Sequence, residues 1–147
     1  MSIPTHDSHP VIGYTTGVFD MFHIGHLNIL KRAKEQCDYL VVGVSTDELV
    51  QEYKHHQTVV PLEQRIAIVS AIRYVDKVVV QTSMDKLAAW QKLHFHKYFH
   101  GDDWKNSPLY NKIEQDLQAK GVEVVFLPHT PGVSTTILVE LIKGGRR

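Results

Sequence analysis

The sequence predicts an α/β fold, namely a doubly wound, Rossmann-like sheet of five parallel strands with helices on both faces. Five short β-rich runs alternate with segments of helical length, and this alternation requires crossover connections between parallel strands. The runs are nearly continuous in Val, Leu, Tyr and Phe rather than strictly alternating, as expected for strands covered on both faces. The strands are expected at 11–14, 39–45, 77–81, 97–101 and 122–127.

Helices are expected between these strands, at 25–36, 61–74, 84–94, 108–119 and 134–143. Pro61 and Pro108 suit first-turn positions, where a missing N–H group costs no hydrogen bond, and Gly121 suits a helix exit. The segment from Glu48 to Val60 is the one long connection that reads as irregular. Long irregular loops in compact domains are often functional.

The chain has the length of one typical domain, 147 residues. We expect a single domain over 11–143, a flexible segment at 1–10 and a tail at 144–147. The longest apolar runs are far below the roughly 18 residues needed to span a bilayer, and no targeting segment is visible. We therefore expect a cytoplasmic protein without membrane insertion.

The charge balance limits the possible partners. Sixteen basic residues face sixteen acidic ones, so no global field favours nucleic acid, and no basic stripe or aromatic ladder is evident. We expect no nucleic-acid partner, and any anion must be bound locally. The single cysteine excludes an internal disulfide and a cysteine-based metal cluster. His94, His96 and His100 are close in sequence, but no carboxylate or cysteine completes a zinc site, so no metal ligand is assigned.

The most informative stretch is GVFDMFHIGH, at 17–26, where the first strand gives way to a helix. In a doubly wound sheet this turn presents backbone N–H groups and the positive end of a helix to a ligand. His23 and His26 can face one site because they are three residues apart at a helix start, and Gly25 permits close backbone approach. Such a pair can donate to phosphoryl oxygens and stabilise the charge that develops when phosphorus is attacked. Simple helix capping is the alternative.

This stretch resembles the signature of the nucleotidyltransferase superfamily that carries a His-x-Gly-His motif. RYVDKV (73–78), GDDW (101–104) and PGVSTT (131–136) are similar to further signatures of its cytidylyltransferase branch. The resemblance covers about residues 11 to 142, and in length and arrangement it is greatest to the small bacterial members that act on glycerol 3-phosphate.

The resemblance implies an enzyme of the EC 2.7.7 class that transfers CMP from CTP to a phosphorylated alcohol, giving a CDP-alcohol and pyrophosphate. Glycerol 3-phosphate is the first acceptor expected, and phosphocholine, phosphoethanolamine, another polyol phosphate or a phosphonate remain alternatives. Mg²⁺, bound chiefly through CTP phosphates and water, and a homodimer are also implied. An adenylyltransferase and a nucleotide-binding module without turnover are the rival classes.

The resemblance also assigns roles to residues. The catalytic set is His23, His26 and Lys54, and the loop cation Lys54 would draw the acceptor phosphate towards the α-phosphate. The acceptor set is Asp20, Lys54 and Lys86, although Lys86 reads equally as a surface lysine. The nucleotide-binding set comprises Gly17, Val18, Phe19, His23, Gly25, His26, Arg73, Gly101, Asp102, Asp103, Trp104, His129, Thr130, Gly132, Val133, Ser134, Thr135 and Thr136.

Three of these assignments have structural alternatives or depart from the pattern. The hydroxyls at 134–136 can cap a helix instead of holding a triphosphate. Arg73 can form a buried pair with Asp76 at a helix-to-strand junction instead of supporting the nucleotide site. The relatives usually carry an arginine in place of His129, and a neutral imidazole cannot replace the charge and fork of a guanidinium. This departure bears on the strength and pH dependence of CTP binding.

Overall fold

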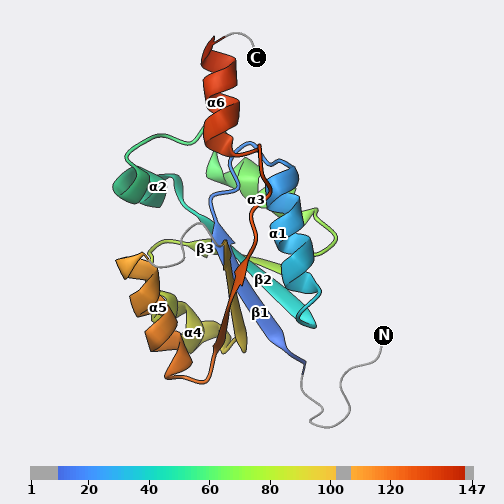
Figure 1. Ribbon diagram of the computed structural model, residues 1–147, viewed down its shortest axis with the longest axis vertical. Helices are drawn as coiled ribbons and strands as arrows, with labels where there is room; N and C mark the ends of the chain where they lie inside the picture. Colours follow the sequence, from blue (N-terminus) through green and yellow to red (C-terminus); the bar gives the residue numbers. More distant parts are fainter. Residues whose placement is uncertain (1–9, 102–106, 145–147) are drawn as a thin grey trace.

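The computed structural model describes residues 10–101 and 107–144. Five parallel strands form one sheet in the order β3-β2-β1-β4-β5, and the predicted fold class is confirmed (Figure 1). β1 extends to Gly17, beyond the predicted end at 14, and the other strands lie close to their predicted positions. Their bounds are β1 Ile12–Gly17, β2 Tyr39–Ser45, β3 Lys77–Gln81, β4 Lys97–Gly101 and β5 Glu123–Leu127.

The strand order places β1 at the centre of the sheet. The chain adds β2 and β3 on one side of β1 and then crosses to the other side for β4 and β5. Thr15 of β1 is thereby paired with Val42 of β2 and with Phe99 of β4, and its hydroxyl donates to the Phe99 carbonyl at 2.9 Å. The turn that follows β1 therefore lies at the topological switch point, where doubly wound sheets bind their ligands.

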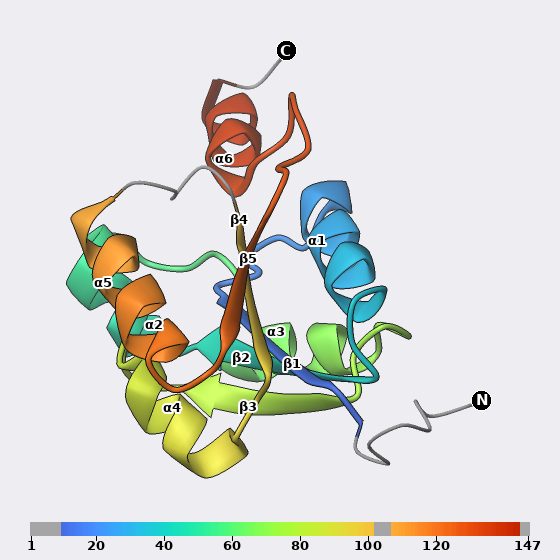
Figure 2. The same ribbon diagram turned by 60° about the horizontal axis from the view of Figure 1, so that its bottom comes forward.

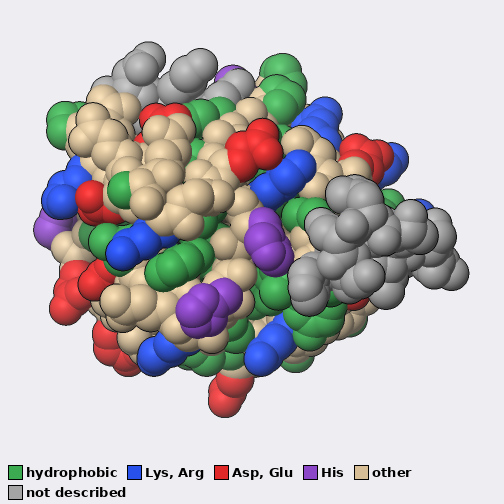
Figure 3. All heavy atoms as spheres, turned by 90° about the horizontal axis from the view of Figure 1, so that it is seen from below, with side chains coloured by type: hydrophobic (Ala, Val, Ile, Leu, Met, Phe, Trp, Pro, Cys, Tyr) green, Lys and Arg blue, Asp and Glu red, His purple; other side chains and the backbone are tan. Residues whose placement is uncertain are grey.

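Helices cover both faces of this sheet. α1 and α3 lie on one face and α4 and α5 on the other, while α2 and α6 lie towards the carboxyl ends of the strands (Figures 1 and 2). Figure 3 shows the molecule from the end opposite α6. On this face Lys and Arg side chains are mixed with Asp and Glu side chains, and the described residues form no continuous basic stripe. The helices span α1 Ile24–Lys34, α2 Asp47–Lys54, α3 Leu62–Ser70, α4 Lys86–Leu93, α5 Pro108–Gln118 and α6 Thr135–Gly144.

The sheet separates two apolar cores. Val41 and Val42 are neighbours on β2, and their side chains enter different cores because successive strand residues point to opposite faces. Val42 packs in the core that contains Leu30 of α1, and Val41 packs in the core that contains Leu117 of α5. β2 is buried on both sides, whereas the edge strand β3 leaves Val80 49% exposed. The continuous apolar pattern thus indicated strand identity correctly but overestimated the burial of the edge strand.

Helix α2 is the main departure from the expected fold, since the segment from 48 to 60 was predicted to be irregular. Thr46 caps this helix by accepting a hydrogen bond from the Leu49 amide at 3.0 Å, and the two acidic residues that follow Thr46 suit the positive end of a helix. His55 ends the helix in the left-handed conformation, with φ of 60°. Lys54 is consequently the last residue of a helix rather than part of a long loop.

Helix α6 stands apart from the body of the protein (Figures 1 and 2). None of its residues is buried, and Ile142 is 68% exposed. Its first turn is nevertheless attached, because the Thr135 hydroxyl donates to the Asp20 carbonyl at 2.8 Å. Within the described ranges, neither α6 nor any other helix has the length and apolar character required to cross a bilayer.

Candidate active site

The two histidines of the first turn form a reciprocal cap at the start of α1. The Gly25 amide donates to Nδ1 of His23 at 3.0 Å, and the His23 amide donates to Nδ1 of His26 at 3.1 Å. The two rings stack with their centroids 3.8 Å apart. Because each Nδ1 accepts a hydrogen bond, each ring carries its proton on Nε2. The turn thus provides a pair of neutral Nε2–H donors.

The surroundings of the two rings favour their neutral form. Three effects together lower the pKa of His26 from 6.5 to about 3, of which burial is the largest and electrostatic interactions with His23 and Lys54 are the others. Burial also lowers the pKa of His23. A proton on either Nδ1 would break a capping hydrogen bond, so helix capping and the neutral charge state are coupled. At neutral pH both rings can therefore donate to phosphate oxygens while neither ring carries a positive charge.

Gly25 makes the fold of this turn possible. A Cβ atom at this position would lie 2.8 Å from Cε1 of the His23 ring and 3.0 Å from its Nδ1. The glycine is therefore required for the His23 ring to fold back over the first turn of α1. In the free protein, the group that lies close to the backbone of Gly25 is this histidine ring. Two residues before His23, Met21 adopts the left-handed conformation with φ of 51°, and Phe19 does so with φ of 55°.

Asp20 connects the histidine turn to the segment that precedes α3. Its two carboxylate oxygens accept hydrogen bonds from the amides of Val59 and Val60, both at 2.8 Å, and the residue is only 3% exposed. Its carbonyl accepts the Thr135 hydroxyl from α6. Asp20, which the resemblance placed in the acceptor set, is thus engaged in holding three segments of the chain together.

Arg65 of α3 is a buried guanidinium at the carboxyl edge of the sheet, and its side chain is fully buried. It donates to the carbonyl oxygens of Val18 and Ser45, at the ends of β1 and β2, and to the Val60 carbonyl. Its remaining nitrogen pairs with the Asp47 carboxylate at 2.5 Å. One side chain therefore fixes the histidine turn, the start of α2 and the segment before α3 relative to one another.

Helix α2 brings Lys54 towards the histidines. Burial by itself raises the pKa of Asp47 in the first turn of α2, but hydrogen bonds from Thr58, Arg65 and the Leu62 amide hold that pKa below its usual value. At the other end of α2, the ammonium group of Lys54 lies 5.8 Å from the centre of the Tyr53 ring. Its charge also reaches His26, whose pKa it lowers. The structure thus places all three predicted catalytic residues at one edge of the sheet.

The segment before α6 also faces this edge. Val133 lies 3.5 Å from the position of a Cβ atom at Gly25. Asn28 of α1 donates to the Thr130 hydroxyl at 2.9 Å. Ser134 caps α6, since it accepts a hydrogen bond from the Ile137 amide at 3.1 Å, which is the structural alternative that the sequence left open. His129, Gly132 and Thr136 are exposed.

Two interpretations of basic residues are corrected by the structure. Arg73 is exposed and hydrogen-bonds the Tyr74 phenol, and Asp76 pairs instead with Lys34 at 2.6 Å, so the alternative of a buried Arg73–Asp76 pair was wrong. Lys86 is 2% exposed and donates to Oε1 of Gln81, so it is not the surface lysine considered as an alternative. Burial lowers the pKa of Lys86 to about 7.

The remaining predicted positions are only partly described. Gly101 ends β4, and Asp102, Asp103 and Trp104 lie outside the described residues. The three clustered histidines have separate environments: His94 ends α4, Nδ1 of His96 accepts the Ile12 amide at 2.9 Å, and His100 packs against Tyr110. Over residues 10–101 and 107–144, no three His, Cys, Asp or Glu side chains are grouped as metal ligands.

The contribution of Arg65 and of helix α2 was missed from the sequence, although each left a signal. Arg65 is a charged residue on the otherwise apolar stripe of α3 that also includes Leu62 and Val69. A charge on a buried stripe indicates a buried polar interaction. For α2, Thr46 followed by two acidic residues is a recognisable helix start.

Comparison with known proteins provides an independent line of evidence. The family described as cytidylyltransferase-like matches residues 14–141. The chain is 38% identical over 133 residues to a glycerol-3-phosphate cytidylyltransferase of Bacillus subtilis, which covers 88% of this chain and 95% of that protein. It is 35% identical over 131 residues to a glycerol-3-phosphate cytidylyltransferase of Staphylococcus aureus, with 88% and 93% covered.

The fold is also similar to solved structures. A lipopolysaccharide core biosynthesis protein from Thermoplasma volcanium superimposes with a TM-score of 0.70 and 23% identity, over 83% of this chain and 98% of that one. At this level of identity the likeness concerns the fold alone.

We predict that Arg65→Met lowers the free energy of unfolding by about 3–5 kcal/mol, because it leaves three carbonyl groups and a carboxylate without their donor. Urea unfolding followed by circular dichroism measures this change. Arg73→Met is the matched control, since Arg73 is exposed, and it should change stability by less than about 0.5 kcal/mol. Equal stabilities of the two variants would contradict the assigned role of Arg65.

We also predict that acidification destabilises the protein through His26. Its pKa in the folded state, about 3, is below the ordinary 6.5, so between these values the unfolded state takes up a proton that the folded state refuses. Stability is therefore full above pH 6.5 and falls as the pH decreases towards 3. In His26→Asn, Oδ1 can accept the His23 amide, and the titration is removed.

Urea unfolding at pH 7 and pH 5 tests this dependence. The wild type should lose about 2 kcal/mol more than His26→Asn between these two pH values. An equal loss in both proteins would show that His26 is not the titrating group.

Proposed function

The chain belongs to the cytidylyltransferase-like family, and on that premise we propose that it transfers the CMP group of CTP to glycerol 3-phosphate, giving CDP-glycerol and pyrophosphate. The observation that supports this function best is the pair of neutral Nε2–H donors at the topological switch point. This position and this chemistry suit a triphosphate that gains negative charge on its oxygens during the reaction.

The reaction is a displacement at phosphorus. An oxygen of the acceptor phosphate attacks the α-phosphorus of CTP, and the bond from this phosphorus to the oxygen bridging to the β-phosphate breaks as pyrophosphate leaves. His23 and His26 donate to the oxygens on which charge accumulates, and no covalent intermediate with the protein is needed. Since both rings are neutral in the free enzyme, they act as hydrogen-bond donors whose orientation is fixed in advance by the cap.

Lys54 provides the cation that this displacement requires. Acceptor and donor are both anions, and their mutual repulsion opposes the approach of the attacking oxygen. An ammonium group at the end of α2, with its charge within reach of His26, lowers that repulsion and positions the acceptor phosphate. The Arg65–Asp47 pair holds the start of the same helix and so contributes to this positioning.

Mg²⁺ is proposed to arrive with CTP and to be bound through phosphate oxygens and water. The one carboxylate in the histidine turn, Asp20, already accepts two backbone hydrogen bonds. The described residues of the turn therefore fit a triphosphate better than a dedicated cation cage. Mg²⁺ supplies charge neutralisation of the triphosphate when bound. A homodimer remains a prediction from the family resemblance.

We expect pyrophosphate release from CTP and Mg²⁺ with glycerol 3-phosphate, and a CDP-glycerol product by ³¹P NMR. The comparison set is phosphocholine, phosphoethanolamine, ribitol 5-phosphate and simple phosphonates, with ATP replacing CTP as the nucleotide control. Turnover with another acceptor alone would correct the substrate while retaining the class. Turnover with ATP alone would contradict cytidylyl transfer.

His23→Asn and His26→Asn should each lower kcat by at least about 100-fold. Asparagine retains an acceptor for the capping amide but lacks a donor at the Nε2 position, so folding at pH 7 should be nearly unchanged. Steady-state kinetics with circular dichroism as the folding control measures both effects. Undiminished turnover in either variant would overturn the role of that histidine.

A further inference from the structure

Asp20 lies between two residues that adopt the left-handed backbone conformation. Phe19 has φ of 55° and Met21 has φ of 51°. A Cβ atom disfavours this conformation, so two such residues in one turn cost free energy that the surrounding contacts must supply. Of the other described residues apart from glycine, His55 and His94 share the conformation, and each of them ends a helix. The turn around Asp20 ends no helix and must be held in place by other contacts.

Three hydrogen bonds of Asp20 hold this turn. Its carboxylate oxygens accept the amides of Val59 and Val60, and its carbonyl accepts the Thr135 hydroxyl, all at 2.8 Å. Asp20 is 3% exposed, so water competes little for these bonds. The segment before α3 thus fixes the side chain, and the first turn of α6 fixes the backbone. A residue held at both points prevents its left-handed neighbours from relaxing.

The backbone conformation of Phe19 determines where its ring lies. The ring is buried in the core beneath α1, and a Cβ atom at Gly17 would lie 2.9 Å from its Cε2. From this position it contacts the His26 ring in a T-shaped arrangement, with the ring centroids 5.4 Å apart. Phe22 contacts the same imidazole, at 5.3 Å between centroids. The direction of the His26 ring is therefore set by two aromatic rings as well as by the cap at Nδ1.

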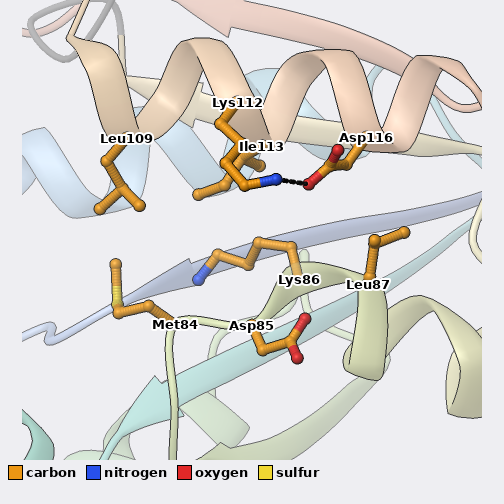
Figure 4. Close-up of a pocket in the computed structure, with 8 residues that line it drawn as sticks. All are labelled: Met84, Asp85, Lys86, Leu87, Leu109, Lys112, Ile113 and Asp116. Atoms are coloured by element: carbon orange, nitrogen blue, oxygen red, sulfur yellow. Dashed lines mark hydrogen bonds and ion pairs between the residues drawn. The ribbon is translucent and has the colours of Figure 1, made fainter.

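Asp20 differs in its surroundings from Lys86, the other buried member of the predicted acceptor set. Lys86 lines a cavity of about 240 Å³ between α4 and α5, together with Met84, Leu109 and Ile113 (Figure 4). A ligand that entered this cavity would contact Lys86 directly. Both carboxylate oxygens of Asp20, in contrast, already accept hydrogen bonds from the backbone. Its contacts indicate a role in the conformation of the turn.

We propose that Asp20 is a positioning residue, whose three hydrogen bonds hold Phe19 in the left-handed conformation and thereby fix the direction of the His26 Nε2–H donor. This inference rests on the proposed function in one respect, namely that His26 donates to phosphate oxygens of CTP. It differs from the acceptor contact that the family resemblance implied for Asp20. The donor is then oriented before either substrate binds.

Asp20→Asn separates the two roles. Asparagine keeps an oxygen for one of the two amides but presents its NH₂ group to the other, so the turn is held less firmly. We expect kcat to fall about 10-fold, with KM for glycerol 3-phosphate within about 2-fold of the wild type, because a misdirected donor slows the chemical step. A raised KM with unchanged kcat would overturn the proposal in favour of acceptor contact. Unchanged values of both constants would overturn it as well.

Asp38→Asn is the matched control for this substitution. The Asp38 carboxylate also accepts a backbone amide, that of Val11 at 2.7 Å, but it lies at the amino ends of β1 and β2, away from the histidine turn. The control variant should therefore keep the kcat and both KM values of the wild type.

Met21 allows the strain to be changed separately. Glycine adopts the left-handed conformation without steric cost, so Met21→Gly reduces what the Asp20 bonds must oppose. Added to Asp20→Asn, it should raise kcat at least about 3-fold over Asp20→Asn alone, while Met21→Gly alone should stay within about 2-fold of the wild type. Met21→Val introduces a β-branched side chain, which tolerates this conformation poorly, and should lower kcat although Asp20 is intact. Equal kcat in Asp20→Asn with and without Met21→Gly would overturn the role of the strained turn.

The His26 ring reports the same link without turnover. In protein with ¹⁵N-labelled histidine, the His26 ring resonances, assigned with His26→Asn, should shift in Asp20→Asn and Met21→Val, because the Phe19 ring moves relative to the imidazole. They should stay in place in Asp38→Asn. Unmoved resonances in Asp20→Asn would overturn the proposal, and if that variant does not fold, unmoved resonances in Met21→Val would do so. If the wild type releases no pyrophosphate with any acceptor, the proposed function fails, while these spectra still determine whether Asp20 positions His26.

Discussion

The carboxyl edge of this protein depends on one buried guanidinium. A charged group can be removed from water only if its donors are satisfied, and Arg65 achieves this with three backbone carbonyls and one carboxylate that come from separate parts of the chain. The geometry of the guanidinium therefore dictates how the end of β1, the end of β2 and the start of α2 are spaced. The histidine turn and Lys54 belong to the segments that this side chain fixes. The catalytic geometry is in this sense a product of α3, which itself carries none of the proposed catalytic groups.

The fold could be predicted from the sequence because its signals are local. Strand composition, helix length and a glycine between two histidines are each visible within a short window. The parts that could not be predicted depend on contacts between distant residues. Asp20 lies in the motif, but its partners are amides at 59 and 60, and amides carry no sequence signature. The alternative for Arg73 was wrong for the same reason. Arg73 and Asp76 are close in sequence, which suggested that they pair, but Asp76 pairs with the distant Lys34 of α1.

In the histidine turn, the structural role of the motif is compatible with the chemistry that we propose for it. Capping was considered as an alternative to phosphate chemistry, and the rings do cap the helix. The capping hydrogen bonds consume Nδ1 of each ring and thereby define which nitrogen is left to donate. In many enzymes a carboxylate sets the tautomer of a histidine. Here the backbone of the same turn performs that task, so the local fold and the protonation state cannot be changed separately.

The central position of β1 has a consequence for the synthesis of the protein. Of the five strands in this sheet β1 is translated first, yet its second neighbour, β4, pairs with it across a sequence separation of 84 residues. Until β4 is made, the nascent chain holds a sheet whose central strand in the finished fold, β1, still has one unpaired edge. Such edges recruit other chains. The interval between translation of β3 and of β4 is therefore the period in which this protein is most exposed to aggregation.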